Sequence, residues 1–353
     1  MLPISVCIIG KNEEKFLEGC LVHLSKYDFE IVFVDTGSTD KTKEIAYKYT
    51  NCIYDFEWIN DFSAARNYAA SKATKDWILC IDCDEYLEPF DVNTLLKMMK
   101  AHPDSSAFID ICNLTEDMKH YTKSKTYRFY PRNFFHWINP IHEQLVRFDN
   151  KPATSFHSGI SVMHYGYISG QVNLLEKNQR NLELLLQLYK KESDNPYHIY
   201  QMGISYFNLG DYENAVFYLE KVTEYDVDPT LIWVQTTIYY YGLSLLNTNQ
   251  PQIALGLEGI YNEFCHIPEY IYLMGLIYAA NGLFAKSLSM FGMVVNMKAE
   301  CHIDAGVTSY QGYFQLGNVC HHLKKDTLAI QYLKKASDYA PAINLLYKIE
   351  KNI

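Results

Sequence analysis

Three acidic residues directly follow a short apolar run, and their spacing suits the binding of a divalent cation. The run at 77–81 is continuous rather than alternating and is flanked by charge, which predicts a buried strand. Asp82 and Asp84 stand at its carboxyl end, with Glu85 next to them. In open α/β sheets this end of a strand is where ligands bind. Two carboxylates at this spacing can hold a hard cation, which in turn holds a diphosphate, although acidic pairs are also common in ordinary loops.

Other polar residues could take part in the same chemistry. Asp35 ends an earlier apolar run, within an Asp-Thr-Gly-Ser turn that could equally serve to cap a helix. Arg66 lies near a predicted helix start, where its fork of donors could reach a phosphate or form a surface salt bridge. His142, Glu143 and His164 lie in patterns where such residues are more often structural, so the residues alone leave their roles open.

The elements that must position these residues alternate between strand and helix. Residues 4–9 predict a strand that Gly10 ends, residues 30–34 predict a second strand, and a helix is predicted between them. Further helices are predicted after Asp35, from residue 62 and around 95–99, and further strands at 127–133 and 160–167. Strand, helix and strand in succession form a βαβ unit, which implies a parallel sheet.

From about residue 171 helical patterns replace the strand signals, and a repeat emerges. A glycine precedes a small residue by 12 positions in Gly203 with Ala215, Gly242 with Ala254, Gly275 with Ser287 and Gly317 with Ala329. This spacing matches tetratricopeptide repeats. It predicts about three to four helical hairpins over 195–345, stacked into a short solenoid in which most tyrosines are packing residues. We therefore divide the chain into an α/β domain at 1–170, a connecting helix at 171–194 and an all-α repeat domain at 195–353.

Composition and charge exclude several classes of protein. The chain has 353 residues, of which 48% are hydrophobic and 20% charged, so it can bury two cores. The 41 acidic residues against 31 basic ones give a net charge of −10, and without a basic block we expect no nucleic-acid partner. The start of the sequence lacks a signal-peptide pattern, and no run is long and apolar enough for a membrane span.

The cysteines indicate the redox environment in which the protein works. Nine cysteines without a disulfide framework favour a reducing environment, so we expect a cytoplasmic protein. Cys80 and Cys83 would point to opposite faces of a strand, and no second pair follows them, so they do not predict a zinc site.

Four motifs in this order resemble the family-2 glycosyltransferases. They lie at 4–13, 34–40, 62–67 and 81–85. The resemblance implies a Rossmann-like α/β domain with the GT-A fold of nucleotide-diphospho-sugar transferases, followed by the all-α tetratricopeptide solenoid. The segments Ile141-His142-Glu143 and His164-Tyr165-Gly166-Tyr167, with the repeats, are similar to the branch that includes the sublancin-type bacteriocin S-glycosyltransferases.

The resemblance also implies roles for single residues. The donor nucleotide would be held by Ile9, Lys11, Asn12, Glu13, Asp35, Arg66, Asn67 and Asp82. Thr36 stands where many relatives carry a second acid, so Asp35 would have to compensate for that base contact. A Mg²⁺ or Mn²⁺ ion would be held by Asp84, with Asp82 and His164 as the further candidates.

The activity implied is an inverting transfer of a hexose or N-acetylhexosamine from a UDP-sugar. The cation would neutralise the leaving diphosphate, and Glu143 would be the base, with His142 as the alternative base or its orienting partner. A cysteine acceptor would need less help than serine or threonine, because a thiol is already partly ionised at neutral pH.

The acceptor is less well defined by the resemblance. We expect a peptide or protein side chain, held in the groove of the repeats, while the alternative role for the repeats is to form a homodimer. Two rival interpretations remain, namely a lipid-linked or cell-wall glycan as acceptor, and a non-enzymatic tetratricopeptide adaptor.

Overall fold

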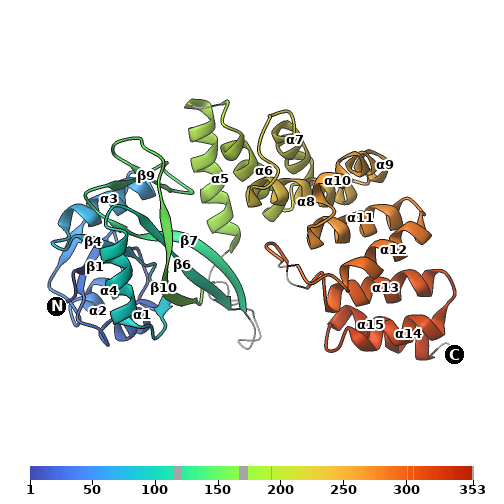
Figure 1. Ribbon diagram of the computed structural model, residues 1–353, viewed down its shortest axis with the longest axis horizontal. Helices are drawn as coiled ribbons and strands as arrows, with labels where there is room; N and C mark the ends of the chain where they lie inside the picture. The colour runs from blue at the N-terminus through green and yellow to red at the C-terminus, as the bar shows by residue number, and fades with distance from the viewer. Residues whose placement is uncertain (115–120, 167–173, 192, 300, 305, 352–353) are drawn as a thin grey trace. The chain divides into compact units, whose positions relative to one another are not determined.

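The computed structural model describes residues 1–114, 121–166, 174–191, 193–299, 301–304 and 306–351 (Figure 1). The chain divides into two compact units, residues 1–174 and 175–353. Among the residues that the structure describes, the first unit contains the strands and helices α1 to α4, and the second unit is helical. This order confirms the predicted fold class of an α/β part followed by an all-α part.

An eight-stranded sheet forms the centre of the first unit, in the order β3-β2-β1-β4-β7-β6-β10-β5. The strands are β1 Ile4–Gly10, β2 Glu30–Asp35, β3 Ile53–Asp55, β4 Trp77–Cys80, β5 Glu85–Leu87, β6 Ser106–Leu114, β7 Tyr121–Pro131 and β10 Ser155–His164. β1 pairs in parallel with β2 and β4, as the predicted βαβ unit requires. β7 lies antiparallel between β4 and β6, and β6 is a strand that the sequence did not predict.

Helices cover both faces of the sheet because successive strand residues enter two different apolar cores. Val6 and Ile8 pack on the side of α1 Leu17–Leu24, α2 Thr42–Ala46 and α4 Val92–Ala101. Cys7 packs on the other side, against α3 Phe62–Lys72 and a small hairpin of β8 Phe135–Ile138 and β9 Gln144–Arg147. Cys80 and Cys83 lie in different cores, as predicted, and all nine cysteines are described and free.

The second unit consists of helical hairpins. The helices are α5 Leu174–Lys191, α6 Pro196–Asn208, α7 Tyr212–Val222, α8 Ile232–Asn247, α9 Pro251–Ala254, the 3₁₀ helix η1 Leu255–Ile260, α10 Tyr261–Phe264, α11 Pro268–Ala280, α12 Phe284–Val294, α13 Tyr310–His322, α14 Asp326–Lys335 and α15 Ala340–Lys351. A Cβ atom on Gly203 would lie 2.5 Å from Leu219 Cγ, and one on Gly317 would lie 2.6 Å from Leu333 Cγ. Glycine is therefore required where α6 meets α7 and where α13 meets α14, as the repeat pattern predicted.

Two parts of the sequence interpretation extend beyond the described residues. Tyr167, the end of the strand predicted at 160–167, is one of them, and β10 ends at His164. Residues 171–173 and 192 of the predicted connecting helix are also outside. Among the helices that the structure describes, none combines the length and apolar composition that crossing a membrane would require.

Candidate active site

The start of α3 positions the first charged residue of the site. Asp61 caps the helix by accepting a hydrogen bond from the backbone N–H three residues later at 2.8 Å. Two residues after Asp61, Ser63 Oγ donates a hydrogen bond to the carbonyl of Asn139 at 2.6 Å, which holds the turn after β8 against α3. This contact brings Glu143, which follows that turn, to the side chain of Arg66.

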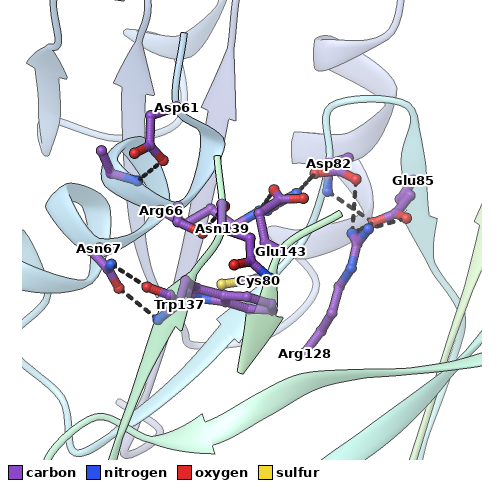
Figure 2. A network of polar contacts seen from close by, with 12 residues as sticks. Asp61, Arg66, Asn67, Cys80, Asp82, Glu85, Arg128, Trp137, Asn139 and Glu143 are labelled. Atoms are coloured by element: carbon purple, nitrogen blue, oxygen red, sulfur yellow. Dashed lines mark hydrogen bonds and ion pairs between the residues drawn. The ribbon is translucent and has the colours of Figure 1, made fainter. Parts of the chain in front are cut away.

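Arg66 joins two of the predicted site residues that are far apart in the sequence. Its Nε donates to Glu143 Oε1 and its Nη2 donates to Asp82 Oδ1, each at 2.9 Å (Figure 2). The guanidinium lies over the ring of Trp137, 5.6 Å from its centroid, and its side chain is 9% exposed. Asp82 is 33% exposed, so this carboxylate is the part of the network that a ligand can reach most easily.

A second guanidinium, from Arg128 on β7, holds the other oxygen of Asp82. Arg128 Nη1 lies 2.9 Å from Asp82 Oδ2, and 3.1 and 2.9 Å from the two carboxylate oxygens of Glu85. Glu85 in turn accepts the backbone N–H of Asp82 at 2.8 Å (Figure 2). Asp82 is therefore fixed through both side-chain oxygens and through its main chain.

The protonation of the two acids is set by the balance of burial and charge. Burial alone would raise the pKa of Asp82, but Arg128 and Arg66 hold it far below its usual range, so this carboxylate is ionised. Burial raises the pKa of Glu85 to about 7, against the opposite effect of Arg128. The two acids therefore differ, because Asp82 stays ionised whereas Glu85 gains a proton near neutral pH.

A β-bulge places Arg128 in the site. Ala107 of β6 is opposite Phe129 of β7, but the next residue, Phe108, is opposite Tyr127, so Arg128 is an extra residue without a partner. Bulges of this kind redirect side chains and occur often beside active sites. The sequence interpretation treated 127–133 only as strand and turn and missed Arg128, because the hydrophobic pattern does not show where two strands change register.

Asp84 forms a separate pair with His164. His164 Nε2 lies 3.2 Å from Asp84 Oδ2, and His164 Nδ1 lies 2.7 Å from the side-chain oxygen of Asn113 on the neighbouring strand β6. A Cβ atom on Gly166 would lie 2.1 Å from Asp84 Oδ2 and 2.7 Å from His164 Nε2, so only glycine leaves this space open. A carboxylate and an imidazole oriented by an outer hydrogen bond fit a divalent cation.

The predicted metal ligands are therefore brought together only in part. Asp84 and His164 meet, whereas Asp82 is paired with the two arginines. Within the described ranges, no group of three histidine, cysteine, aspartate or glutamate side chains is arranged to hold a metal ion.

The loops after β1 and β2 are tied to each other. Asn12, at a positive φ of 57°, accepts the backbone N–H of Thr39 at 2.8 Å through its side-chain oxygen. Asp35 Oδ2 accepts the backbone N–H groups of Gly37 and Ser38 at 3.2 and 3.0 Å, so it does stabilise the turn. Its Oδ1 is buried and makes no hydrogen bond to any residue that the structure describes. An unpaired buried carboxylate oxygen is costly, and a ligand hydroxyl or base N–H could satisfy it.

The other predicted donor-binding residues on β1 and its loop differ in exposure. Ile9 is half-buried near the end of β1, and its carbonyl lies 3.6 Å from the thiol of Cys83. Lys11 is exposed in the following loop. The backbone N–H of Glu13 donates to Thr42 at 2.7 Å, which links this loop to the start of α2.

Asn67 and His142 lie on the α3 side of the sheet. The side-chain amide of Asn67 makes two hydrogen bonds to the main chain of Trp137, at 2.8 and 2.9 Å. Its side chain therefore holds β8 in place. His142 occupies a positive φ of 51° in the turn directly before Glu143.

Comparisons with known proteins agree with this architecture. Residues 5–171 match the family described as "Glycosyl transferase family 2", and residues 199–228 and 310–343 match "Tetratricopeptide repeat". The SPbeta prophage-derived glycosyltransferase SunS of Bacillus subtilis is 30% identical over 227 residues, which cover 62% of this chain and 53% of SunS. The chain thus spans about half the length of that relative.

Two other relatives are similar over shorter stretches. A TPR repeat-containing protein of Synechococcus elongatus is 38% identical over 108 residues, which cover 31% of this chain and 27% of that protein. The poly(ribitol-phosphate) beta-N-acetylglucosaminyltransferase TarS of Staphylococcus aureus is 32% identical over 120 residues, which cover 31% and 19%. The first unit of the chain is thus similar to the family-2 glycosyltransferases over residues 5–171, and two stretches of the second unit are similar to tetratricopeptide repeats.

Proposed function

We propose that this chain is an inverting, metal-dependent glycosyltransferase that moves a hexose or N-acetylhexosamine from a UDP-sugar to a peptide or protein side chain. The observation that carries the proposal is the bridge from Asp82 through Arg66 to Glu143. It links an acid at the end of a central parallel strand, where ligands of such sheets bind, to a carboxylate that can take a proton.

The donor nucleotide is assigned to the edge formed by the ends of β1, β2 and β4. An ionised Asp82 can only accept hydrogen bonds, so it suits a ribose hydroxyl. The two guanidinium groups beside Asp82 oppose a dication at that carboxylate, which favours the hydroxyl over the metal as its partner. The unpaired oxygen of Asp35 supplies a second acceptor for the nucleoside.

Asp84 and His164 would hold a Mg²⁺ or Mn²⁺ ion, and the space beside Gly166 supports this assignment. Such an ion supplies positive charge to the leaving diphosphate. The protein's part is orientation, because the contact of His164 Nδ1 with Asn113 turns the Nε2 atom towards Asp84.

Glu143 is the proposed base. Its Oε1 is anchored by Arg66, while its Oε2 makes no hydrogen bond to the residues that the structure describes. The free oxygen takes the proton of the acceptor hydroxyl or thiol as the acceptor atom forms its bond to the anomeric carbon. The bond from that carbon to the diphosphate oxygen breaks, and the nucleoside diphosphate leaves with the electron pair. Attack from the side opposite the leaving group inverts the configuration.

The repeats favour a peptide acceptor, because stacked helical hairpins present an extended surface for chain binding. A cell-wall glycan is the second candidate, since the name of TarS describes action on poly(ribitol-phosphate). A cytoplasmic location is part of the proposal and is supported by the nine cysteines that form no disulfide.

A donor screen tests the proposal. Purified protein is mixed with Mn²⁺ or Mg²⁺ and a panel of UDP- and GDP-sugars, and the released nucleotide is measured for the wild type and Asp84→Ala. We expect metal-dependent release from one UDP-sugar that the variant loses. No release and no nucleotide binding by calorimetry would reject the enzyme in favour of a tetratricopeptide adaptor.

A further inference from the structure

Arg128 meets Asp82 through the oxygen that Arg66 leaves free. We infer that Arg128 is a positioning residue that fixes the Asp82 carboxylate for a ribose hydroxyl of the donor. The inference rests on the proposed function and adds a residue that none of the sequence motifs contains.

The contacts fix both the position and the rotation of the carboxylate. Arg66 Nη2 holds Oδ1 and Arg128 Nη1 holds Oδ2, each at 2.9 Å. An aspartate carboxylate that is held at one oxygen can still rotate about the Cβ–Cγ bond, whereas a carboxylate held at both oxygens cannot. Its remaining lone pairs then point in fixed directions, so a ligand hydroxyl meets an acceptor that needs no rearrangement.

Arg128 is itself held in place by Glu85. Its Nη1 contacts both oxygens of Glu85, whose side chain is 3% exposed and which also accepts the backbone N–H of Asp82. The contacts therefore form a closed ring, from the Asp82 backbone to Glu85, from Glu85 to Arg128, and from Arg128 to the Asp82 side chain. A substitution of Arg128 would shift the Asp82 carboxylate without removing a group that contacts the ligand.

The bulge in β7 supports a role in the site rather than in general stability. With regular pairing, Arg128 would be opposite Phe108 and the ladder of hydrogen bonds would be continuous, so the bulge brings no gain in strand pairing. The extra residue interrupts the ladder, and its side chain reaches a carboxylate that is one-third exposed.

Arg147 shows what a buried arginine does elsewhere in the same unit. It lies on β9, its side chain is 6% exposed, and it holds Asp149 at 2.8 and 2.9 Å. It contacts neither Asp82 nor Glu143 in the described network, so it is a matched control for the loss of a buried guanidinium.

Calorimetry with UDP and with 2′,3′-dideoxy-UDP, in the presence of Mg²⁺, tests the inference. The wild type should prefer UDP by roughly tenfold or more, as expected for hydroxyls bound to a charged group. In Arg128→Gln this preference should fall at least threefold, and in Arg147→Gln it should be unchanged. If Arg128 only stabilised the fold, its replacement would weaken the binding of both nucleotides equally and leave the ratio of the two affinities unchanged.

A cycle with Asp82→Asn shows whether Arg128 acts through Asp82. In the Asp82→Asn background, replacing Arg128 should leave the ratio unchanged. If Arg128→Gln does not fold by circular dichroism, Arg128→Lys keeps the charge but not the fork of donors and serves in its place. An unchanged ratio in a folded Arg128 variant overturns the inference alone, whereas a wild type that binds neither UDP nor GDP overturns the proposed function and this inference with it.

Discussion

Glu143 Oε1 lies 2.9 Å from Arg66 Nε, although the two residues are 77 positions apart in the sequence. The same guanidinium reaches Asp82, so the proposed base and the proposed donor-binding acid share one buried cation. A change at Glu143 or Asp82 therefore alters the contacts of the other carboxylate through Arg66. The first variant below separates the role of Glu143 in transfer from donor binding.

Glu143→Gln should separate transfer from donor binding. The amide keeps the shape and an oxygen that can accept from Arg66, but it cannot take a proton, so UDP binding should stay within about twofold while transfer to a serine peptide falls by roughly 10²–10⁴-fold. A cysteine peptide should lose less, because its thiol is partly ionised. Intact-mass assays of both peptides measure this, and normal transfer by the variant would remove Glu143 from the role of base.

Asn113→Leu should weaken the binding of Mn²⁺ without removing a ligand. The variant loses the contact that orients His164, and outer hydrogen bonds of this kind are worth roughly 10- to 100-fold in metal affinity. Titration of Mn²⁺ followed by paramagnetic resonance measures the affinity.

His157→Ala is the control for this metal prediction. His157 also contacts an aspartate, Asp110 at 3.1 Å, but that pair involves Lys123 and lies outside the proposed site. The affinity of the His157→Ala variant for Mn²⁺ should equal that of the wild type. Equal affinities for Asn113→Leu and the wild type would argue against a metal at Asp84 and His164.

Gly203→Ala should destabilise the second unit. The added Cβ would lie 2.5 Å from Leu219 Cγ, in the contact between α6 and α7, and overpacking of this kind costs about 1–3 kcal/mol. In Gly292→Ala the added methyl meets nothing within 4 Å, so the higher helix propensity of alanine should stabilise α12 by about 0.5–1 kcal/mol. Urea unfolding followed by circular dichroism measures both, and a neutral Gly203→Ala would show that the two helices can separate at little cost.

Stability of the second unit should fall as the pH rises from about 10 to about 12. Burial raises the pKa of Tyr241, Tyr272 and Tyr278 to about 12, whereas an unfolded tyrosine ionises near pH 10. In this window the unfolded state has released protons that the folded state retains, so the free energy of unfolding decreases with pH, and below pH 10 the contribution is intact. Thermal unfolding at several pH values measures the slope.

Two tyrosine variants provide the comparison for the alkaline slope. Tyr272→Phe should reduce it, and Tyr347→Phe, at a side chain that is 58% exposed, should not. Identical slopes in all three proteins would mean that other groups cause the loss of stability.

The fold could be predicted from sequence wherever local patterns determine it. Apolar runs gave β1, β2 and β4, and the parallel pairing of such strands places Asp35 and Asp82 at the same edge. The glycines of the repeat likewise predicted close contacts between helices. These features depend on residue types at short spacing, which the sequence shows directly.

The parts that were missed depend on pairing between distant segments. Asn113 belongs to β6, in which polar residues interrupt the apolar pattern, and Arg128 enters the site through a change in register. Register is set by contacts across strands, and one residue of slip reverses the face of every side chain that follows. Neither residue could be assigned a role before the strands were paired.

The bulge makes the site dependent on the number of residues in β7 as well as on their types. Deleting one residue between Arg128 and the start of the strand would let the bulge be absorbed, and Arg128 would then point away from Asp82 although it is still present. An insertion or deletion in this strand would thus disrupt the proposed donor site while every polar residue discussed above is retained. Among related chains, the length of this strand is accordingly as informative about activity as the identity of the charged side chains.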